Sequence, residues 1–391
     1  MRSGPEVQSL RNTPNQLCSG GDWHISRPAT QIAGRPSEER TRMSRSFHFV
    51  SGLSAVALAA LAACSPSGSD DTDTAEEPAV VETGTGAEDA SPESSAEYRS
   101  RDELLAEFDE ALQRAQATNG DGSPAIWTMS DDDTTVHIFG TVHLMRPDLE
   151  WRTDEFTEKF NEADILVLEL DMVSEEGQQA VARDFLSRGF YGDGRTLSNE
   201  LPAPVLAAFE SALSGLSLPV SAFDPMEPWM AAVNLSVLQL QSDGFDPNAG
   251  IEQILIADAE AAGKEFAFLE TAADQAAIFD ELPEDTQAAY LYETSITLVD
   301  TSRTLDQVVD EWRDGDVEGL GVLVANPDTG GGDGIYDALF VERNENWVPQ
   351  IEGFLDDVEG TVFVAVGAGH LAGPDSVITL LRDKGYEIEG P

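Results

Sequence analysis

The chain has 391 residues, which is long enough for one large domain or two ordinary ones with a substantial core. Its 73 acidic and 22 basic residues give a net charge of −51, which disfavours nucleic acid and anionic lipid headgroups as partners. The two cysteines, Cys18 and Cys64, are too few for a disulfide framework or a cysteine-based zinc site.

Residues 43–63 have the pattern of a secretion signal. Arg45 supplies a positive charge, residues 49–62 are apolar, and Leu61-Ala62-Ala63-Cys64 resembles the lipobox of bacterial lipoproteins. The apolar run is too short for a permanent transmembrane helix. We therefore expect Cys64 to carry a lipid that anchors the mature protein in the bacterial cell envelope, facing the periplasm or the exterior. An ordinary signal peptide with an incidental cysteine is the alternative.

The segments on either side of this signal do not have the pattern of a folded domain. A signal should begin a chain, so we interpret residues 1–42 as a spurious N-terminal extension and Met43 as the true start. Residues 64–98 are rich in Ser, Gly, Asp, Glu and Thr, and we predict a disordered acidic tether. Residues 99–391 are then expected to form a single folded domain.

The expected folded part alternates strands and helices. Apolar spacing predicts a helix over 101–116, strands over 134–142, 165–172, 265–271 and 361–367, and a short last strand at 386–389. Helices are predicted over 152–164, most of 174–262, 273–325, 336–357 and 374–385, with a loop at 326–334. This order predicts an α/β fold, with a mainly parallel central sheet flanked by helices and a large helical insertion between strands.

Four of the predicted strands lead directly to a polar residue. These residues are His143, Glu169, Glu270 and His370. Because the carboxyl ends of parallel strands meet at one edge of a sheet, we expect the four side chains to converge. Two imidazoles and two carboxylates suit either a divalent metal or metal-free acid–base hydrolysis. Each residue alone also fits a structural role, as a hydrogen-bonded core histidine or a salt-bridge glutamate.

The two histidines end the same motif, Gly-x-x-His. Gly140 precedes His143 by three positions, and Gly367 precedes His370 by three positions. Glycine lets the backbone turn sharply and brings a loop close to a ligand. The remaining histidine of the expected folded part, His137, lies within a strand and is interpreted as structural.

Several stretches of the chain resemble the TraB/GumN family, whose animal members include the Tiki peptidases and which belongs to the erythromycin-esterase/ChaN-like fold group. The resemblance covers roughly residues 123–390 and includes the stretches "IFGTVHL", "ADILVLELD", "EPWMAAVNL", "GIEQILIADAEAAGKEFAFLETAADQ", "LFVERNENWVPQI" and "VFVAVGAGHLAGPDSVITLLRDKGYEI".

The resemblance implies a metal-dependent peptidase that acts on a peptide or a partner protein. Tiki-like members work with manganese or cobalt, and donors without thiolate also suit iron or zinc. The resemblance implies that Arg343, followed by Asn344, clamps a substrate carboxylate or holds a site glutamate in place. It implies that metal binding and catalysis are shared among His143, Glu169, Glu252, Glu270 and His370.

Three other functions fit the same residues. Erythromycin-esterase relatives hydrolyse an ester without metal, using a histidine base and carboxylates. ChaN-like relatives bind haem iron, which makes a haem- or ligand-binding lipoprotein the second alternative. A role in partner recognition is the third, because a fold alone does not establish a function.

Overall fold

The computed structural model describes residues 98–325 and 335–391. The predicted extension, the signal, Cys64 and residues 64–97 of the tether lie outside the described residues, as does the predicted loop at 326–334. Those predictions, and the division of the chain into domains, stay predictions. None of the described helices is long and apolar enough to cross a membrane.

A five-stranded sheet with the order β1-β2-β5-β3-β4 forms the centre of the described part. Strands β2 (Thr134–Thr141), β5 (Gly360–Gly367), β3 (Ile165–Leu168) and β4 (Glu265–Phe268) are parallel. Strand β1 (Ile126–Ser130) pairs with β2 in the antiparallel direction and forms one edge. The predicted α/β fold with a mainly parallel sheet is confirmed.

The sheet differs from the prediction at its ends. Strand β1 was not predicted, and the predicted last strand at 386–389 forms only a bridge between Thr128 and Glu389. Strand β3 stops short of position 172 because the chain turns at Asp171, whose side chain accepts hydrogen bonds from the backbone N–H groups of Val173 and Ser174.

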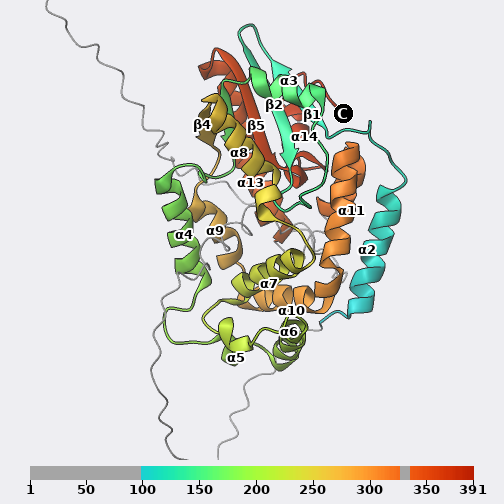
Figure 1. Cartoon of the computed structure of the whole chain (residues 1–391), viewed down its shortest axis with the longest axis vertical. Helices are drawn as coiled ribbons and strands as arrows, with labels where there is room; N and C mark the ends of the chain where they lie inside the picture. The colour runs from blue at the N-terminus through green and yellow to red at the C-terminus, as the bar shows by residue number, and fades with distance from the viewer. Residues whose placement is uncertain (1–97, 326–334) are drawn as a thin grey trace, which may run out of the picture. The chain divides into compact units, whose positions relative to one another are not determined.

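The central strand β5 is buried on both faces, as expected for a parallel strand covered by helices. Val362, Val364 and Val366 belong to the apolar cluster that includes residues of α13 (Glu342–Asp357) and α14 (Val377–Asp383). Phe363 and Ala365 point to the opposite face and belong to the main core. Figure 1 shows α3 (Asp154–Glu162) and α8 (Ile251–Ala262) on that second side of the sheet.

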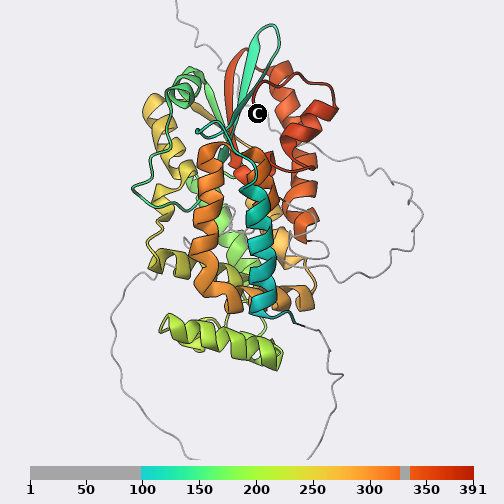
Figure 2. The ribbon, with the colours of Figure 1, turned by 90° about the vertical axis from the view of Figure 1, so that its right-hand side faces the viewer.

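The helices between the strands form the rest of the described structure, and the predicted helical insertion is confirmed. Helix α7 is buried on nearly all sides and packs on α10, which packs on α6. Figure 2 shows α2 beside α11, which is linked to it by an ion pair between Arg303 and Asp109. The remaining bounds are α2 (Arg101–Ala115), α4 (Glu175–Gly189), α5 (Leu197–Glu200), α6 (Ala203–Gly215), α7 (Pro228–Ser242), α9 (Ala272–Asp280), α10 (Glu284–Thr297), α11 (Thr301–Asp314), α12 (Val317–Val324), η4 (Asp337–Val341) and η5 (Ala368–Leu371), with short turns η1 (Val220–Ala222), η2 (Pro247–Ala249) and η3 (Leu298–Asp300).

Candidate functional site

The carboxyl ends of the four parallel strands carry the residues singled out in the sequence. His143 comes two residues after β2, Glu169 directly follows β3, and Glu270 comes two residues after β4. His370 lies in the turn η5 that follows β5. His143, Glu169 and His370 are buried, and the side chain of Glu270 is 8% exposed. The parallel sheet therefore places two imidazoles and two carboxylates at one edge.

Arg343, near the start of α13, joins three of these side chains. Its Nη2 donates to Glu169 Oε2 at 2.7 Å and to Glu270 Oε1 at 2.6 Å, and its Nε donates to Glu270 Oε2 at 3.1 Å. Its Nη1 lies 2.8 Å from His370 Nε2. Burial alone would lower the pKa of Arg343, but the charges of Glu270 and Glu169 outweigh it and raise the pKa. A buried guanidinium thus supplies the positive charge of this cluster.

Both ring nitrogens of His370 have partners. Arg343 can only donate, so His370 Nε2 accepts, and His370 Nδ1 then donates to Asn344 Oδ1 at 2.7 Å. Asn344 is held in turn by its Nδ2, which donates to the Asp375 carbonyl oxygen at 2.8 Å. Burial, and next the charge of Arg343, hold the pKa of His370 well below its ordinary value. His370 is therefore a neutral imidazole with one defined tautomer.

His143 has one engaged nitrogen and one that is free of partners in the described structure. Its Nδ1 lies 2.7 Å from Glu252 Oε1, which also accepts a hydrogen bond from the Thr141 hydroxyl. Its Nε2 is buried and has no hydrogen-bond partner among the described residues. Burial lowers the pKa of His143, but the charge and hydrogen bond of Glu252 outweigh it, so the pKa is raised. The pair has the arrangement of a base and the carboxylate that orients it.

Glycine allows Glu252 to approach His143. A methyl group on Gly250, which directly precedes α8, would lie 2.1 Å from the His143 carbonyl oxygen. The backbone N–H of Ile251 donates to the Val142 carbonyl oxygen at 3.0 Å, so the start of α8 is fastened to the loop after β2. A larger residue at position 250 would push the helix, and Glu252 with it, away from His143.

Gly367 lies close to three of the candidate site residues, Glu169, His143 and His370. A methyl group there would lie 3.2 Å from Glu169 Oε1, 3.7 Å from His143 Nε2 and 3.5 Å from His370 Cδ2. The Gly367 N–H donates to Glu169 Oε1 at 2.7 Å. A cavity of about 40 Å³, sufficient for a water molecule, is lined by His143, Leu168, Glu169, Leu170, Met172, Glu252, Gln253 and Ile256.

The structure adds residues to the site that the sequence did not single out. Gln275, on α9, is fully buried, and its Nε2 donates to Glu270 Oε1 at 2.9 Å and to Glu169 Oε2 at 3.3 Å. Thr141 donates to Glu252 as described above. Asn344, which the resemblance had already marked beside Arg343, accepts from His370. The sequence signals for Gln275 are its position on the helix that begins after Glu270 and its place at the end of the family-like stretch 250–275.

The predicted metal ligands do not fit a metal ion in this arrangement. Both nitrogens of His370 have partners, and Glu169 and Glu270 are paired with Arg343, which brings a positive charge into the place where they meet. Among the predicted ligands, His143 Nε2 and Glu252 Oε2 are the buried atoms that have no hydrogen-bond partner within the described residues. Across residues 98–325 and 335–391, no three His, Cys, Asp or Glu side chains form a group that could hold a metal ion.

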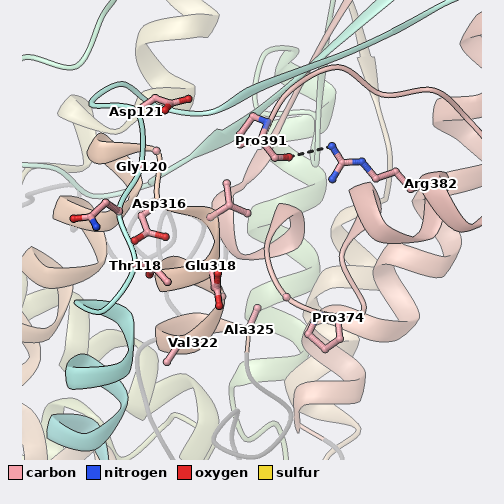
Figure 3. Close-up of a pocket in the computed structure, with 15 residues that line it drawn as sticks. Thr118, Gly120, Asp121, Asp316, Glu318, Val322, Ala325, Pro374, Arg382 and Pro391 are labelled. Atoms are coloured by element: carbon pink, nitrogen blue, oxygen red, sulfur yellow. Dashed lines mark hydrogen bonds between the residues drawn. The ribbon is translucent and has the colours of Figure 1, made fainter.

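A much larger groove, of about 940 Å³, lies elsewhere in the described structure. It is lined by parts of the loop after α2, the start of α12, the loop at 373–374 and the C-terminal residue, and contains none of the predicted site residues. Figure 3 shows Arg382 on one wall of the groove, where it donates to the Pro391 carbonyl oxygen at 3.0 Å. The groove therefore lies apart from the strand ends that carry the predicted site residues.

Comparisons with known proteins agree with the sequence resemblance. The uncharacterized protein YbaP of Escherichia coli is 24% identical over 259 residues, which are 66% of this chain and 92% of that protein. The uncharacterized protein YbaP of Shigella flexneri matches with the same identity and coverage. No solved structure matches the chain. Residues 125–390 match the TraB/PrgY/gumN family, and the chain belongs to this family.

Proposed function

We propose that this protein is a hydrolase in which His143, oriented by Glu252, activates a water molecule for attack on an ester or amide carbonyl. One observation carries the proposal. His143 Nε2 is buried, lacks a partner in the described structure, and lies near Glu169 Oε1 at the cavity, while Nδ1 is held by Glu252. A buried polar atom without a partner is costly unless a ligand, here water and substrate, satisfies it.

The proposed reaction follows from this geometry. Neutral His143 accepts a proton at Nε2 from a water molecule, whose oxygen forms a bond to the substrate carbonyl carbon. The His143 imidazolium then returns the proton to the leaving oxygen or nitrogen as the bond to the carbonyl carbon breaks. Glu252 stabilises the imidazolium between these steps, because its carboxylate lies 2.7 Å from Nδ1.

The second histidine has a different role in this proposal. His370 is neutral and engaged at both nitrogens, so it holds the Arg343 guanidinium rather than exchanging protons with substrate. The Arg343 guanidinium pairs with both Glu169 and Glu270. Burial raises the pKa of Glu270, and the charge of Arg343 opposes that rise without cancelling it.

The cavity is small, so substrate binding requires its outer wall to move. Met172, Gln253 and Ile256 line the cavity and are partly exposed, whereas the catalytic side chains beneath them are more deeply buried. Leu168 and Leu170 add apolar walls, which favours an uncharged group at the reacting carbonyl. A peptide or ester bond has this property.

Hydrolysis by the purified full chain tests the proposal. The chain and its His143→Ala variant are incubated with a mixture of p-nitrophenyl esters and with an internally quenched peptide library, each with and without EDTA. We expect turnover of at least one substrate class that EDTA leaves unchanged and His143→Ala abolishes. Turnover that EDTA removes and manganese or cobalt restores would instead support a metal-dependent peptidase. Failure of both panels with folded protein, together with haem uptake, would favour the ligand-binding alternative.

We also propose that the activity is displayed in the cell envelope on a lipid anchor at Cys64. The lipobox pattern supports this location. Metabolic labelling of the chain with an alkyne-bearing fatty acid, compared with Cys64→Ser, tests it. Loss of label in the variant supports the anchor, and equal labelling of the two chains contradicts it.

A further inference from the structure

Gln275 occupies an unusual position beside the two carboxylates. Its Nε2 contacts Glu169 Oε2 and Glu270 Oε1, which are the same two oxygens that Arg343 Nη2 contacts. Two donors from different helices, α9 and α13, therefore bridge the same pair of negatively charged oxygens. A guanidinium alone leaves part of each oxygen's hydrogen-bonding capacity unused, and the amide fills it.

The orientation of the Gln275 amide is dictated by charge. With the amide turned the other way, its carbonyl oxygen would face two carboxylate oxygens and be repelled by them. In the observed orientation Gln275 Oε1 is buried and has no partner within the described residues. The side chain thus leaves one of its own polar atoms unsatisfied while donating to both glutamates. The hydrogen bonds to the two carboxylates therefore contribute more to stability than a partner for Gln275 Oε1 would.

Helix α9 delivers Gln275 because of how it begins. Thr271 follows Glu270 and caps the helix by accepting a hydrogen bond from the Asp274 N–H at 3.2 Å, while the Asp274 carboxylate accepts one from the Thr271 N–H at 3.2 Å. This capping box fixes the first turn of α9 directly after the strand end. Gln275 lies one residue beyond the box, so its side chain reaches back to the oxygens of Glu169 and Glu270.

The hydrogen bonds of Gln275 restrict the carboxylate of Glu169 more than that of Glu270. Both oxygens of Glu270 are held by Arg343, through Nε and Nη2. Glu169 contacts Arg343 through Oε2 only, and its Oε1 accepts from the Gly367 N–H. A methyl group on Gly367 would lie 3.2 Å from Glu169 Oε1 and 3.7 Å from His143 Nε2. A second donor on Glu169 Oε2 restricts rotation of this carboxylate and so keeps Oε1 in place.

We propose that Gln275 is a positioning residue: by bridging Glu169 and Glu270 together with Arg343, it holds Glu169 Oε1 between Gly367 and the water-binding side of His143. This inference rests on the proposed function for its effect on turnover, but its structural part does not. Without the amide, Glu169 keeps its contacts with Arg343 and the Gly367 N–H but loses the second donor at Oε2. Its carboxylate then rotates more freely, and the water that His143 activates loses a fixed neighbour.

The test uses Gln275→Met, which keeps the volume of the side chain and removes the donor, in the full chain. Gln287→Met is the matched control, because Gln287 is also a buried glutamine and donates to the Asp280 and Leu282 carbonyl oxygens at 3.4 and 3.1 Å, away from the carboxylates. If Gln275→Met does not fold, Gln275→Asn replaces it. This variant keeps an amide but withdraws it by one carbon–carbon bond.

Two measurements separate positioning from a general effect on stability. The first is the amide resonance of Gly367 in a ¹H–¹⁵N spectrum, which reports the hydrogen bond to Glu169 Oε1. The second is turnover of whichever substrate the chain hydrolyses. We expect the Gly367 resonance to move in the Gln275 variant and not in the control, and kcat to fall about 10- to 100-fold with KM nearly unchanged.

The outcomes are distinguishable. An unmoved Gly367 resonance, or an equal change in the Gln287 control, overturns the inference. A moved resonance with reduced kcat supports both the inference and the proposed function. A moved resonance in a chain that hydrolyses neither esters nor peptides supports the positioning of Glu169 by Gln275, while the proposed function fails.

Discussion

His143 and His370 end the same Gly-x-x-His motif at the same edge of the sheet, yet their surroundings differ. His370 is engaged at both nitrogens, by Arg343 and Asn344, and its pKa is depressed by burial and by the guanidinium. His143 is engaged at one nitrogen, by Glu252, and its pKa is raised. The same local sequence thus produces one imidazole that belongs to a closed hydrogen-bonded network and one that can accept a proton from a ligand.

This difference shows that the motif serves position rather than chemistry. The glycine three residues before each histidine lies within or at the end of its strand, and neither has a positive φ. The partners on α8 and α13 decide whether the imidazole is available. The unequal pair also shows how few donors at this edge are left open to a metal ion. Arg343 takes up the carboxylates and one histidine, and Glu252 leaves the other histidine with one open nitrogen.

The largest expected effect is on activity at His143. Replacement of His143 by Ala removes the proposed base, and turnover falls by about 10²–10⁴-fold. Steady-state kinetics on the substrate found in the hydrolysis panels measures this loss, and thermal unfolding checks that the variant is folded. Turnover within a factor of two of the parent chain would remove the distinction between the two histidines.

The next largest effect is on stability at Arg343. Arg343→Met leaves Glu169 and Glu270 as buried carboxylates without their guanidinium, and the free energy of unfolding falls by about 3–5 kcal/mol. Arg146→Met is the control, because Arg146 pairs with Asp306 at 2.8 Å on the surface and such pairs contribute about 0–1 kcal/mol. Denaturant titration of both variants makes the comparison, and equal losses would contradict a central role for Arg343.

His370 is expected to matter for stability more than His143 does. His370→Ala leaves Asn344 Oδ1 and Arg343 Nη1 each without one buried partner, which costs about 2–4 kcal/mol. His143→Ala removes a side chain that already has an unpartnered nitrogen, so we expect a smaller fall in the free energy of unfolding. The order of the two losses in denaturant titration is the critical result, and the reverse order would show that His143 also belongs to a structural network.

The pH dependence of turnover gives a further test of the difference between His143 and His370. A base must be neutral to accept a proton, and the pKa of His143 is raised above 6.5, so kcat/KM increases as pH rises through that raised pKa. Glu252→Gln removes the carboxylate charge that raises the pKa. The midpoint of the pH–rate profile then moves to lower pH and the limiting rate falls. A midpoint that stays in place would mean that another group titrates.

The smallest expected effect is on metal content. Because Arg343 already pairs with the predicted carboxylate ligands, we expect the full chain to retain well below one manganese, cobalt, iron or zinc ion per molecule after desalting. The same content is expected for the His143→Ala/His370→Ala double variant. Elemental mass spectrometry measures both chains. About one ion in the parent and none in the double variant would restore the metal centre predicted from the sequence.

The sequence by itself determined the edge of the sheet at which the site lies. Runs such as residues 361–366 are apolar on both faces, so they predict buried parallel strands, and the residues after such strands share an edge. His143, Glu169, Glu270 and His370 were therefore found from local pattern and one topological rule. Glu252 and Arg343 came from the family resemblance, without a geometric reason.

Only the tertiary structure decided which partner each of these side chains has. Glu252, Gln275 and Arg343 reach the strand ends from α8, α9 and α13, and their approach depends on helix packing over separations that no local pattern encodes. Gln275 follows Glu270 by only five residues, but its two contacts need Glu169 from another strand. Hydrogen bonds and charges act over a few ångströms, so the roles of these groups depend on distances that the assembled core sets.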